Sequence, residues 1–336
     1  MPRVLIVPAP LFDQPGEHIE LLHSAGFDVI FPPAKKAVLS EAEIIAALDG
    51  VSAVIAGSEP YNDRVLTARK SLRVVSRSGV GSDAIVLDDA TKHKVVVTIT
   101  PGTNHDAVAE SAMALLLAVV RSIVTLDRAV RANRWPREPL MPVRGKTLGI
   151  VGLGRIGQSV AVRAAGFGVK LLAFEMIPDR DFVRRYGIEL VDLDTLLARS
   201  DFVTLHVPLT AETRGLINRA TLAKMKRGAI LVNTARGGLV VEADLLDALR
   251  SGQLGGAGLD VFEVEPAVGN PLLEFDSVIA SPHVAGVDTQ SLAEMATLAA
   301  QNIIDLSRGV WPEPCVVNPA VRAGWRWSPE NSQTAP

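Results

Sequence analysis

The fold of this chain follows from one stretch near its middle, Leu148-Gly149-Ile150-Val151-Gly152-Leu153-Gly154-Arg155-Ile156-Gly157. A short apolar strand pattern runs into a G-x-G-x-x-G turn, and residues 158–165 continue as a helix pattern. In such a turn the first glycine makes the bend, the second lets backbone approach a pyrophosphate, and the third allows close helix–strand packing. The helix N-terminus offers free N–H groups to the anion. The stretch therefore predicts a dinucleotide-binding unit.

An acidic residue follows at the spacing that this unit requires. Glu175 comes directly after the strand pattern Lys170–Phe174, 23 residues after Gly152 and 18 after Gly157. A carboxylate there accepts hydrogen bonds from the ribose diol of NAD and repels the 2′-phosphate of NADP. Arg180 lies nearby in sequence, and its positive charge would favour the 2′-phosphate of NADP. Glu175 is the stronger signal, so we expect NAD rather than NADP. The alternative is a glycine-rich turn in an unrelated α/β protein, which strand, spacing and acid together disfavour.

Strand and helix patterns alternate through the first hundred residues. Short β-branched runs are separated by amphipathic segments, which predicts a parallel sheet with helices on its faces. The expected strands are Val4–Val7, Val29–Phe31, Ala53–Ala56, Val74–Ser76 and Val95–Thr98, and the expected helices are Glu17–Ala25, Glu41–Leu48 and Arg64–Lys70.

A second series spans residues 146–283. Its expected strands are Thr147–Val151, Lys170–Phe174, Ile188–Val191, Phe202–His206, Ala229–Val232, Gly256–Leu259 and Ser277–Ala280. Between the two series, apolar spacing predicts one long helix from His105 to about Arg131, and the proline-rich residues 131–142, with Trp135, predict an arm. We expect a last helix over Ser291–Arg308 and a frayed polar end, Ser328–Pro336.

Composition excludes several classes of protein. A chain of 336 residues with 48% hydrophobic and 21% charged residues suggests two globular domains and excludes a disordered one. A net charge of −3 provides no basic surface for nucleic acid or anionic membrane. The single cysteine, Cys315, excludes an intrachain disulfide framework, and the histidines have no metal-ligand spacing, so we expect no metal. The longest apolar run, Ala112–Val120, is too short to span a bilayer, and we expect a cytoplasmic protein without a signal peptide.

Three further segments carry polar residues directly after predicted strands. They are Val232-Asn233-Thr234-Ala235-Arg236-Gly237-Gly238, Gly258-Leu259-Asp260-Val261-Phe262-Glu263-Val264-Glu265-Pro266 and Ala280-Ser281-Pro282-His283-Val284-Ala285-Gly286. Ligands of open α/β sheets bind at the carboxyl ends of the strands, so we expect these segments to converge on one site. Taken singly, His283 could be a loop histidine, Arg236 a helix cap and Glu265 a solvated acid.

Together these segments resemble the D-2-hydroxyacid dehydrogenase family, whose members include phosphoglycerate dehydrogenases and hydroxypyruvate or glyoxylate reductases. The 29 residues from Arg236 to Glu265 and the 18 from Glu265 to His283 match the family. The resemblance covers about residues 3–318. It also rests on Gly79-Val80-Gly81-Ser82-Asp83, Pro101-Gly102-Thr103-Asn104, Val108-Ala109-Glu110 and His206-Val207-Pro208-Leu209-Thr210.

The resemblance implies the role of each residue. His283 would be the acid–base group, paired with Glu265, and Arg236 would bind the substrate carboxylate. Physical chemistry agrees, because a histidine titrates near working pH, a carboxylate favours its charged form and arginine binds carboxylates bidentately. The remaining implied contacts to substrate are Gly79, Val80, Gly81 and Asn104. Those implied for NAD are Gly152, Gly154, Arg155, Ile156, Gly157, Glu175, His206, Val207, Pro208, Thr213, Thr234, Ala235, Asp260, His283 and Gly286, with Asp260 at the nicotinamide carboxamide.

The resemblance also implies a fold of two doubly wound parallel-sheet domains. Residues 1–104 and 285–336 would form a flavodoxin-like substrate domain, and residues 105–284 a Rossmann-type NAD domain, with a cleft that closes on substrate. The helix from His105 and the Trp135 arm resemble the region that forms the family's homodimer.

The substrate is expected to be a small 2-oxo or 2-hydroxy acid, of the hydroxypyruvate or glyoxylate type. D-3-phosphoglycerate dehydrogenase is the alternative, although Glu59 lies where a phosphate would require a cation. Glu265 argues against formate, where the family carries Gln, and Val80 against phosphite, where it carries Lys nearby. A third reading, an NAD-sensing corepressor, is disfavoured because such proteins usually carry Trp at the position of Gly286.

Overall fold

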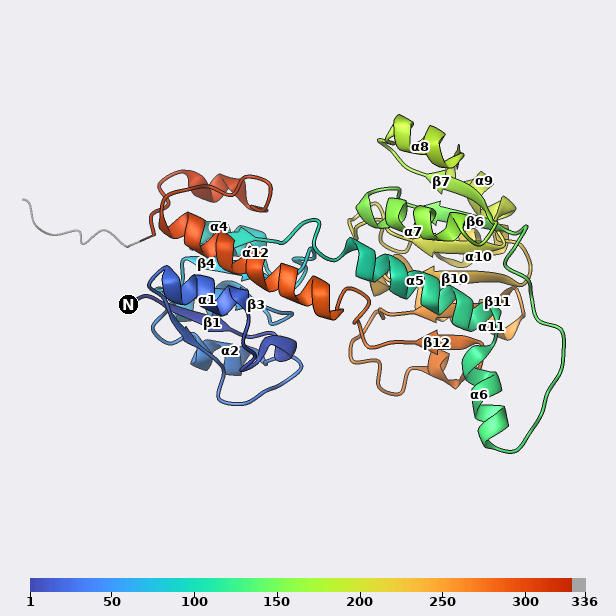
Figure 1. Cartoon of the computed structure of the whole chain (residues 1–336), viewed down its shortest axis with the longest axis horizontal. Helices are drawn as coiled ribbons and strands as arrows, with labels where there is room; N and C mark the ends of the chain where they lie inside the picture. Colours follow the sequence, from blue (N-terminus) through green and yellow to red (C-terminus); the bar gives the residue numbers. More distant parts are fainter. Residues whose placement is uncertain (328–336) are drawn as a thin grey trace, which may run out of the picture. The chain divides into compact units, whose positions relative to one another are not determined.

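The computed structural model describes residues 1–327, so the predicted frayed end, Ser328–Pro336, lies outside the described residues. The described chain divides into two units. Unit 1 holds Met1–Asn104 and the residues from Asp288 onward, and unit 2 holds His105–Val287. Each unit is built on its own parallel sheet (Figure 1).

Unit 1 contains a five-stranded parallel sheet in the order β2-β1-β3-β4-β5. This order, with the chain reversing direction across the sheet at β1 and β3, is that of the flavodoxin-like fold. The strands are β1 (Arg3–Ile6), β2 (Asp28–Ile30), β3 (Val51–Ala56), β4 (Val74–Arg77) and β5 (Val96–Thr98). Helices cover both faces, which explains why the central strands are apolar on both sides. They are α1 (Glu17–Ser24), α2 (Glu41–Ala47), α3 (Asp63–Ala68), α4 (Leu87–Lys92) and α12 (Thr289–Ser307).

Unit 2 contains a seven-stranded parallel sheet in the order β12-β11-β10-β9-β6-β7-β8, the Rossmann arrangement with one added strand. The strands are β6 (Thr147–Val151), β7 (Lys170–Phe174), β8 (Glu189–Leu190), β9 (Phe202–Leu205), β10 (Ala229–Asn233), β11 (Leu254–Leu259) and β12 (Val278–Ala280). The helices are α5 (His105–Val120), α6 (Ile123–Arg131), α7 (Arg155–Ala165), α8 (Arg180–Tyr186), α9 (Leu193–Arg199), α10 (Arg219–Lys224) and α11 (Glu242–Arg250).

The sheet of unit 2 is buried on both faces. Along β10, Ile230 and Val232 belong to the hydrophobic cluster on one face, and Leu231 belongs to the cluster on the other. Successive side chains of a strand point to opposite faces, so an uninterrupted apolar run is what a doubly covered strand needs. Most residues of these strands are therefore apolar, and Asn233 is the polar residue at the carboxyl end of β10.

The prediction of one helix from His105 to Arg131 is wrong. The chain forms two helices, α5 and α6, which meet at an angle of 57°. Ser122 lies between them with a φ of +49°, a left-handed conformation that interrupts the helical hydrogen-bond ladder. Among the described residues no single helix has the length and apolar content to cross a bilayer, although α5 and α6 together, as a bent pair, pass that test.

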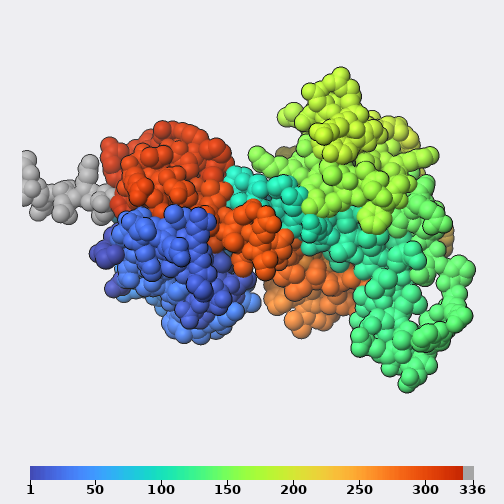
Figure 2. All heavy atoms as spheres, viewed as in Figure 1, coloured from blue at the N-terminus to red at the C-terminus, as the bar shows by residue number. Residues whose placement is uncertain are grey.

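Residues 132–146 after α6 form an extended arm, as the prolines predict. In the space-filling view, α6 and this arm project from the body of unit 2 (Figure 2). The arm leaves large apolar side chains in solvent, and Trp135 is 69% exposed.

The predicted fold class, two parallel-sheet α/β domains, is confirmed by the two sheets. Each predicted strand has an observed counterpart that starts and ends within two residues of it. Helix α4 (Leu87–Lys92) was not predicted, because only Leu87 and Ala90 of its residues are apolar, too few to show a period.

Candidate active site

Glu265 and His283 form a direct pair in unit 2. Nδ1 of His283 and Oε2 of Glu265 are 2.7 Å apart, and Oε1 of Glu265 accepts a hydrogen bond from the N–H of Phe262 at 3.0 Å. Burial raises the pKa of Glu265, but the hydrogen bonds from His283 and Phe262 and the charges of His283 and Arg236 outweigh it, so the pKa lies below its usual value. Glu265 is therefore an ionised hydrogen-bond partner of His283.

Arg236 is presented by a turn that Asn233 closes. Asn233, the last residue of β10, is buried, and its Oδ1 accepts a hydrogen bond from the N–H of Ala235 at 3.1 Å while its Nδ2 donates to the carbonyl of Arg236 at 2.8 Å. Gly237 follows, and a Cβ there would lie 1.9 Å from the carbonyl carbon of Phe262. Only glycine permits this approach of the Arg236 turn to the loop that carries Glu265.

Asp260 organises the loop that carries His283. Its buried carboxylate accepts hydrogen bonds from Ser281 Oγ at 2.6 Å and from the N–H groups of Val284 and Ala285 at 3.0 and 2.9 Å. Its backbone carbonyl accepts the N–H of His283 at 2.8 Å. His283 has a φ of +56°, which is uncommon for a residue other than glycine and requires such support.

Two glycines of the glycine loop differ in the space around them: Gly154 leaves room for an anion, and Gly157 leaves none. A Cβ on Gly157 would lie 2.0 Å from the carbonyl oxygen of Gly152, whereas a Cβ on Gly154 would meet nothing within 4 Å. Gly157 therefore permits the close packing of α7, and the backbone of Gly154 faces open space. Arg155 begins α7, whose first N–H groups have no helical acceptor, so the loop fits a dinucleotide pyrophosphate.

Glu175 lies beside the same loop. Its Oε2 accepts the N–H of Leu153 at 2.7 Å, and its Oε1 accepts the N–H of Ile177 at 3.0 Å. A carboxylate offers about four acceptor positions, so these two bonds leave capacity for a ribose diol. The bonds also orient the side chain.

Two polar atoms in the loops after β9 and β10 have no partner. Nδ1 of His206 and Oγ1 of Thr234 are buried without a hydrogen bond within residues 1–327. Burial lowers the pKa of His206 to about 3, so the ring is neutral, and its Nε2 lies 2.9 Å from Thr204 Oγ1. Orphaned polar atoms beside a glycine loop are consistent with a bound polar ligand. The other predicted cofactor residues, Val207, Pro208, Thr213, Ala235 and Gly286, lie in loops after β9, β10 and β12.

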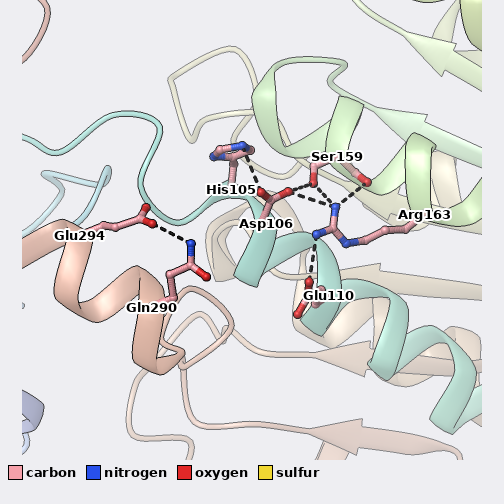
Figure 3. A network of polar contacts seen from close by, with 7 residues as sticks. All are labelled: His105, Asp106, Glu110, Ser159, Arg163, Gln290 and Glu294. Atoms are coloured by element: carbon pink, nitrogen blue, oxygen red, sulfur yellow. Dashed lines mark hydrogen bonds and ion pairs between the residues drawn. The ribbon is translucent and has the colours of Figure 1, made fainter.

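A polar network ties the glycine-loop helix α7 to α5 (Figure 3). Asp106 accepts a hydrogen bond from Ser159 at 2.6 Å and pairs with Arg163 at 3.0 Å, and Arg163 also pairs with Glu110 at 2.9 Å. The hydrogen bond from Ser159 and the charges of His105 and Arg163 hold the pKa of Asp106 below its usual range. The network stays charged and fixes the two helices against each other.

The predicted carboxylate-binding glycines belong to unit 1, with Asn104 at the end of its first segment. The N–H of Gly79 donates to Thr100 Oγ1 at 2.9 Å, so this group is already occupied. Val80 is exposed, Gly81 is partly exposed and Asn104 is buried.

Asn233 and Thr100 were not identified from the sequence. Both are buried polar residues at or just after a strand end, which is the one signal that could have found them. Within residues 1–327, no group of three histidine, cysteine, aspartate or glutamate side chains is arranged to hold a metal ion.

Comparisons with a family model and with known proteins indicate the same family. The family model for the NAD binding domain of D-isomer specific 2-hydroxyacid dehydrogenases matches residues 113–285. The chain is 43% identical over 297 residues to a glyoxylate reductase of Korarchaeum cryptofilum, an alignment that covers 86% of this chain and 88% of that protein. It is 39% identical over 298 residues to a D-3-phosphoglycerate dehydrogenase of Archaeoglobus fulgidus, covering 88% of this chain but only 56% of that longer relative.

Solved structures agree with this result. The crystal structure of a glyoxylate reductase from Paecilomyes thermophila superposes with a TM-score of 0.80 at 29% identity and covers 94% of this chain and 98% of that chain.

Proposed function

Because the chain belongs to the D-isomer specific 2-hydroxyacid dehydrogenase family, we propose that it interconverts a small 2-oxo acid and its D-2-hydroxy acid. It is an NAD-dependent oxidoreductase that acts on a CH–OH group. The substrate we propose is of the glyoxylate or hydroxypyruvate type. The observation that carries the proposal is the His283–Glu265 pair, which lies in the same unit as Arg236 and a glycine loop that fits a dinucleotide.

Three residues of unit 2 have distinct roles in the proposed reaction. Bound NADH supplies the hydride to C2 of the substrate. Nε2 of His283, the ring nitrogen that does not face Glu265, donates a proton to the oxygen on C2 as negative charge develops there. Ionised Glu265 stabilises the imidazolium before transfer, and the fork of Arg236 binds the substrate carboxylate. In the oxidative direction His283 accepts the proton.

The cofactor contacts follow from the loop geometry. We assign the pyrophosphate to the N–H groups from Gly154 to Ile156 and the adenosine ribose to Glu175, whose carboxylate retains acceptor capacity. The unpartnered atoms of His206 and Thr234 would be covered when the loop is filled. The remaining proposed contacts are Gly152, Arg155, Gly157, Val207, Pro208, Thr213, Ala235, Asp260, His283 and Gly286.

Unit 1 is proposed as the substrate domain. The N–H groups of Val80 and Gly81 would bind the substrate carboxylate, with Asn104 nearby and with Gly79 supporting the loop through Thr100. The exposed apolar arm around Trp135 supports a homodimer. A single cysteine and NAD-dependent chemistry suit the reducing cytoplasm, where we propose the protein acts.

D-3-phosphoglycerate dehydrogenase remains the second candidate, because of the 39% identity to such an enzyme. The test is NADH oxidation against glyoxylate, hydroxypyruvate, pyruvate, 2-oxoglutarate and phosphohydroxypyruvate, repeated with NADPH. We expect the highest kcat/KM with glyoxylate or hydroxypyruvate. A preference for phosphohydroxypyruvate would favour the second candidate, and NADH binding without turnover of any acid would contradict both.

A further inference from the structure

One face of α5 packs closely against β11 in unit 2. Ser111, Leu115 and Val119 follow one another at intervals of four, so they form one row along the helix. A Cβ on Gly258 would lie 2.8 Å from Cβ of Leu115. A Cβ on Gly256 would lie 2.7 Å from Cγ1 of Val119. The two glycines therefore let the helix approach the strand, and the two contacts set the register between them.

This register brings Ser111 level with Asp260. Four residues of a helix span about 6 Å and two residues of a strand span about 6.6 Å, so the rows on α5 and β11 advance together. Beyond the contact between Leu115 and Gly258, the next residue of the helical row is Ser111. The next residue on that face of the strand row is Asp260, directly after β11. The hydroxyl and the carboxylate are therefore expected side by side.

Ala285 connects these two side chains. Its N–H donates to Oδ2 of Asp260 at 2.9 Å, and its carbonyl oxygen accepts a hydrogen bond from Oγ of Ser111 at 3.1 Å. Ala285 is buried and lies two residues after His283. The loop that carries the acid–base candidate is therefore bonded both to the end of β11 and to α5.

Helix α5 is a rigid support for this contact. Its first turn is bonded to α7 through Asp106, which accepts a hydrogen bond from Ser159 at 2.6 Å (Figure 3). Nine of its 16 residues are buried, including the two that pack on β11. A loop that is bonded to this helix at Ala285 has less freedom than a loop held by Asp260 alone.

We propose that Ser111 is a positioning residue for His283, whose loop it holds through Ala285 in the place where proton transfer to the substrate oxygen is fastest. His283 has a φ of +56°, a conformation that persists only where the surrounding structure fixes it. Asp260 fixes the loop from β11, and Ser111 fixes it from α5. The inference rests on the proposed function, in which His283 donates the proton.

The test is the substitution Ser111→Ala. Alanine is the best helix former, so α5 should form and thermal unfolding should show a folded variant. The enzyme–NADH complex is mixed with the 2-oxo acid that the wild type reduces fastest, and NADH oxidation is followed in a single turnover. We expect this rate to fall about fivefold, the factor that one neutral hydrogen bond represents. The dissociation constant of NADH should stay within about twofold of the wild-type value.

The solvent deuterium isotope effect on the same rate separates positioning from a general loss of structure. Proton transfer from a displaced His283 should limit the rate more strongly, so the isotope effect should increase in Ser111→Ala. Ser111→Thr keeps the hydroxyl and should restore the isotope effect and most of the rate. If Ser111→Ala does not fold, Ser111→Cys replaces it, because a thiol is only a weak donor.

Ser251→Ala is the matched control. It also removes a serine hydroxyl of unit 2 that donates to a backbone carbonyl, that of Ala248 at 3.2 Å. Ser251 lies at the end of α11, away from the loop that carries His283, so the rate and the isotope effect should stay at their wild-type values.

The dependence on His283 is tested by combining Ser111→Ala with His283→Gln. The added substitution should change the residual rate by less than about twofold, because the group through which Ser111 acts is gone. A further loss of about fivefold in the double variant would overturn the inference. An unchanged rate in Ser111→Ala would also overturn it, whether or not NADH binding weakens. A wild type that reduces no 2-oxo acid would overturn the proposed function, and the inference with it.

Discussion

Replacing Glu265 with glutamine tests the acid–base pair most directly. The change removes the charge opposite His283 but keeps an oxygen that can accept a hydrogen bond. Two unit charges about 4 Å apart interact by about 1 kcal/mol in water and about 4 kcal/mol at an effective dielectric constant of 20. The side chains of His283 and Glu265 are 45% and 36% exposed, so solvent screening places the value near the lower end, at about 1–2 kcal/mol.

Since about 1.4 kcal/mol corresponds to one pH unit, the loss of this charge should move the pH dependence of 2-oxo acid reduction by about one unit in Glu265→Gln. In the proposed mechanism His283 donates the proton, so we expect reduction of a 2-oxo acid to fade as pH rises. The fading limb should move to lower pH by about one unit. Glu265 has a lowered pKa and is ionised across this range, so its own titration does not obscure the shift.

The assay is kcat/KM for 2-oxo acid reduction from pH 5 to 10 at constant ionic strength. Glu274→Gln, an exposed carboxylate in the same unit, serves as the control and should leave the limb in place. A limb that stays within about 0.2 pH units in Glu265→Gln would refute the electrostatic pairing, even if kcat falls, because a purely structural role changes rates without moving the titration.

Three further predictions, which use four substitutions, test the neighbouring assignments. Arg236→Lys keeps the charge but loses the bidentate fork, and we expect kcat/KM to fall by one or more orders of magnitude; a loss below about threefold would exclude the assigned role. Glu175→Ala should narrow the preference for NADH over NADPH, measured as a ratio of kcat/KM, and an unchanged ratio would assign cofactor choice elsewhere. Gly157→Ala should lower the free energy of unfolding by a few kcal/mol, because its Cβ would lie 2.0 Å from a backbone oxygen, whereas Gly154→Ala should unfold like the wild type and bind NADH more weakly by calorimetry. Equal stability of the two glycine variants would contradict the packing argument.

The strands and the convergence of the segments that carry the three catalytic candidates were predictable because both depend on simple rules. An uninterrupted apolar run between polar loops indicates a strand covered on both faces, and parallel strands end at one edge of a sheet. Arg236, Glu265 and His283 follow β10, β11 and β12, which are neighbours in the sheet. Their meeting therefore required no knowledge of side-chain positions.

The break between α5 and α6 was not predictable from the same rules. Residues 105–131 keep an apolar face throughout, and Ser122 is neither glycine nor proline. No sequence signal indicates the left-handed backbone conformation of Ser122, because the apolar period continues on both sides of it. Packing of α5 on the sheet decides where the helix ends, and packing is not visible in a local pattern.

The sequence also did not show which polar side chains point toward a ligand and which point into the protein. Glu59, expected to oppose a phosphate, is turned inward onto its own loop, and Asp260, expected at the nicotinamide, accepts three hydrogen bonds from the loop that carries His283. Buried N–H groups need acceptors, and the nearest short polar side chain supplies them. Which side chain accepts a given N–H group depends on their distance in the folded chain, and the sequence does not show that distance.

Buried polar residues hold the candidate site residues in position. The N–H of Asp260 donates to the carbonyl of Asn233 at 3.0 Å, so the residue that closes the Arg236 turn is bonded to the residue that braces the His283 loop. The turn that carries Arg236 and the loop that carries His283 are thereby connected through adjoining buried groups. A general acid and a carboxylate-binding residue must keep their separation to within a fraction of an ångström through each turnover. Two buried side chains with nearly every hydrogen bond satisfied can maintain that separation, whereas exposed loops, with fewer fixed contacts, cannot.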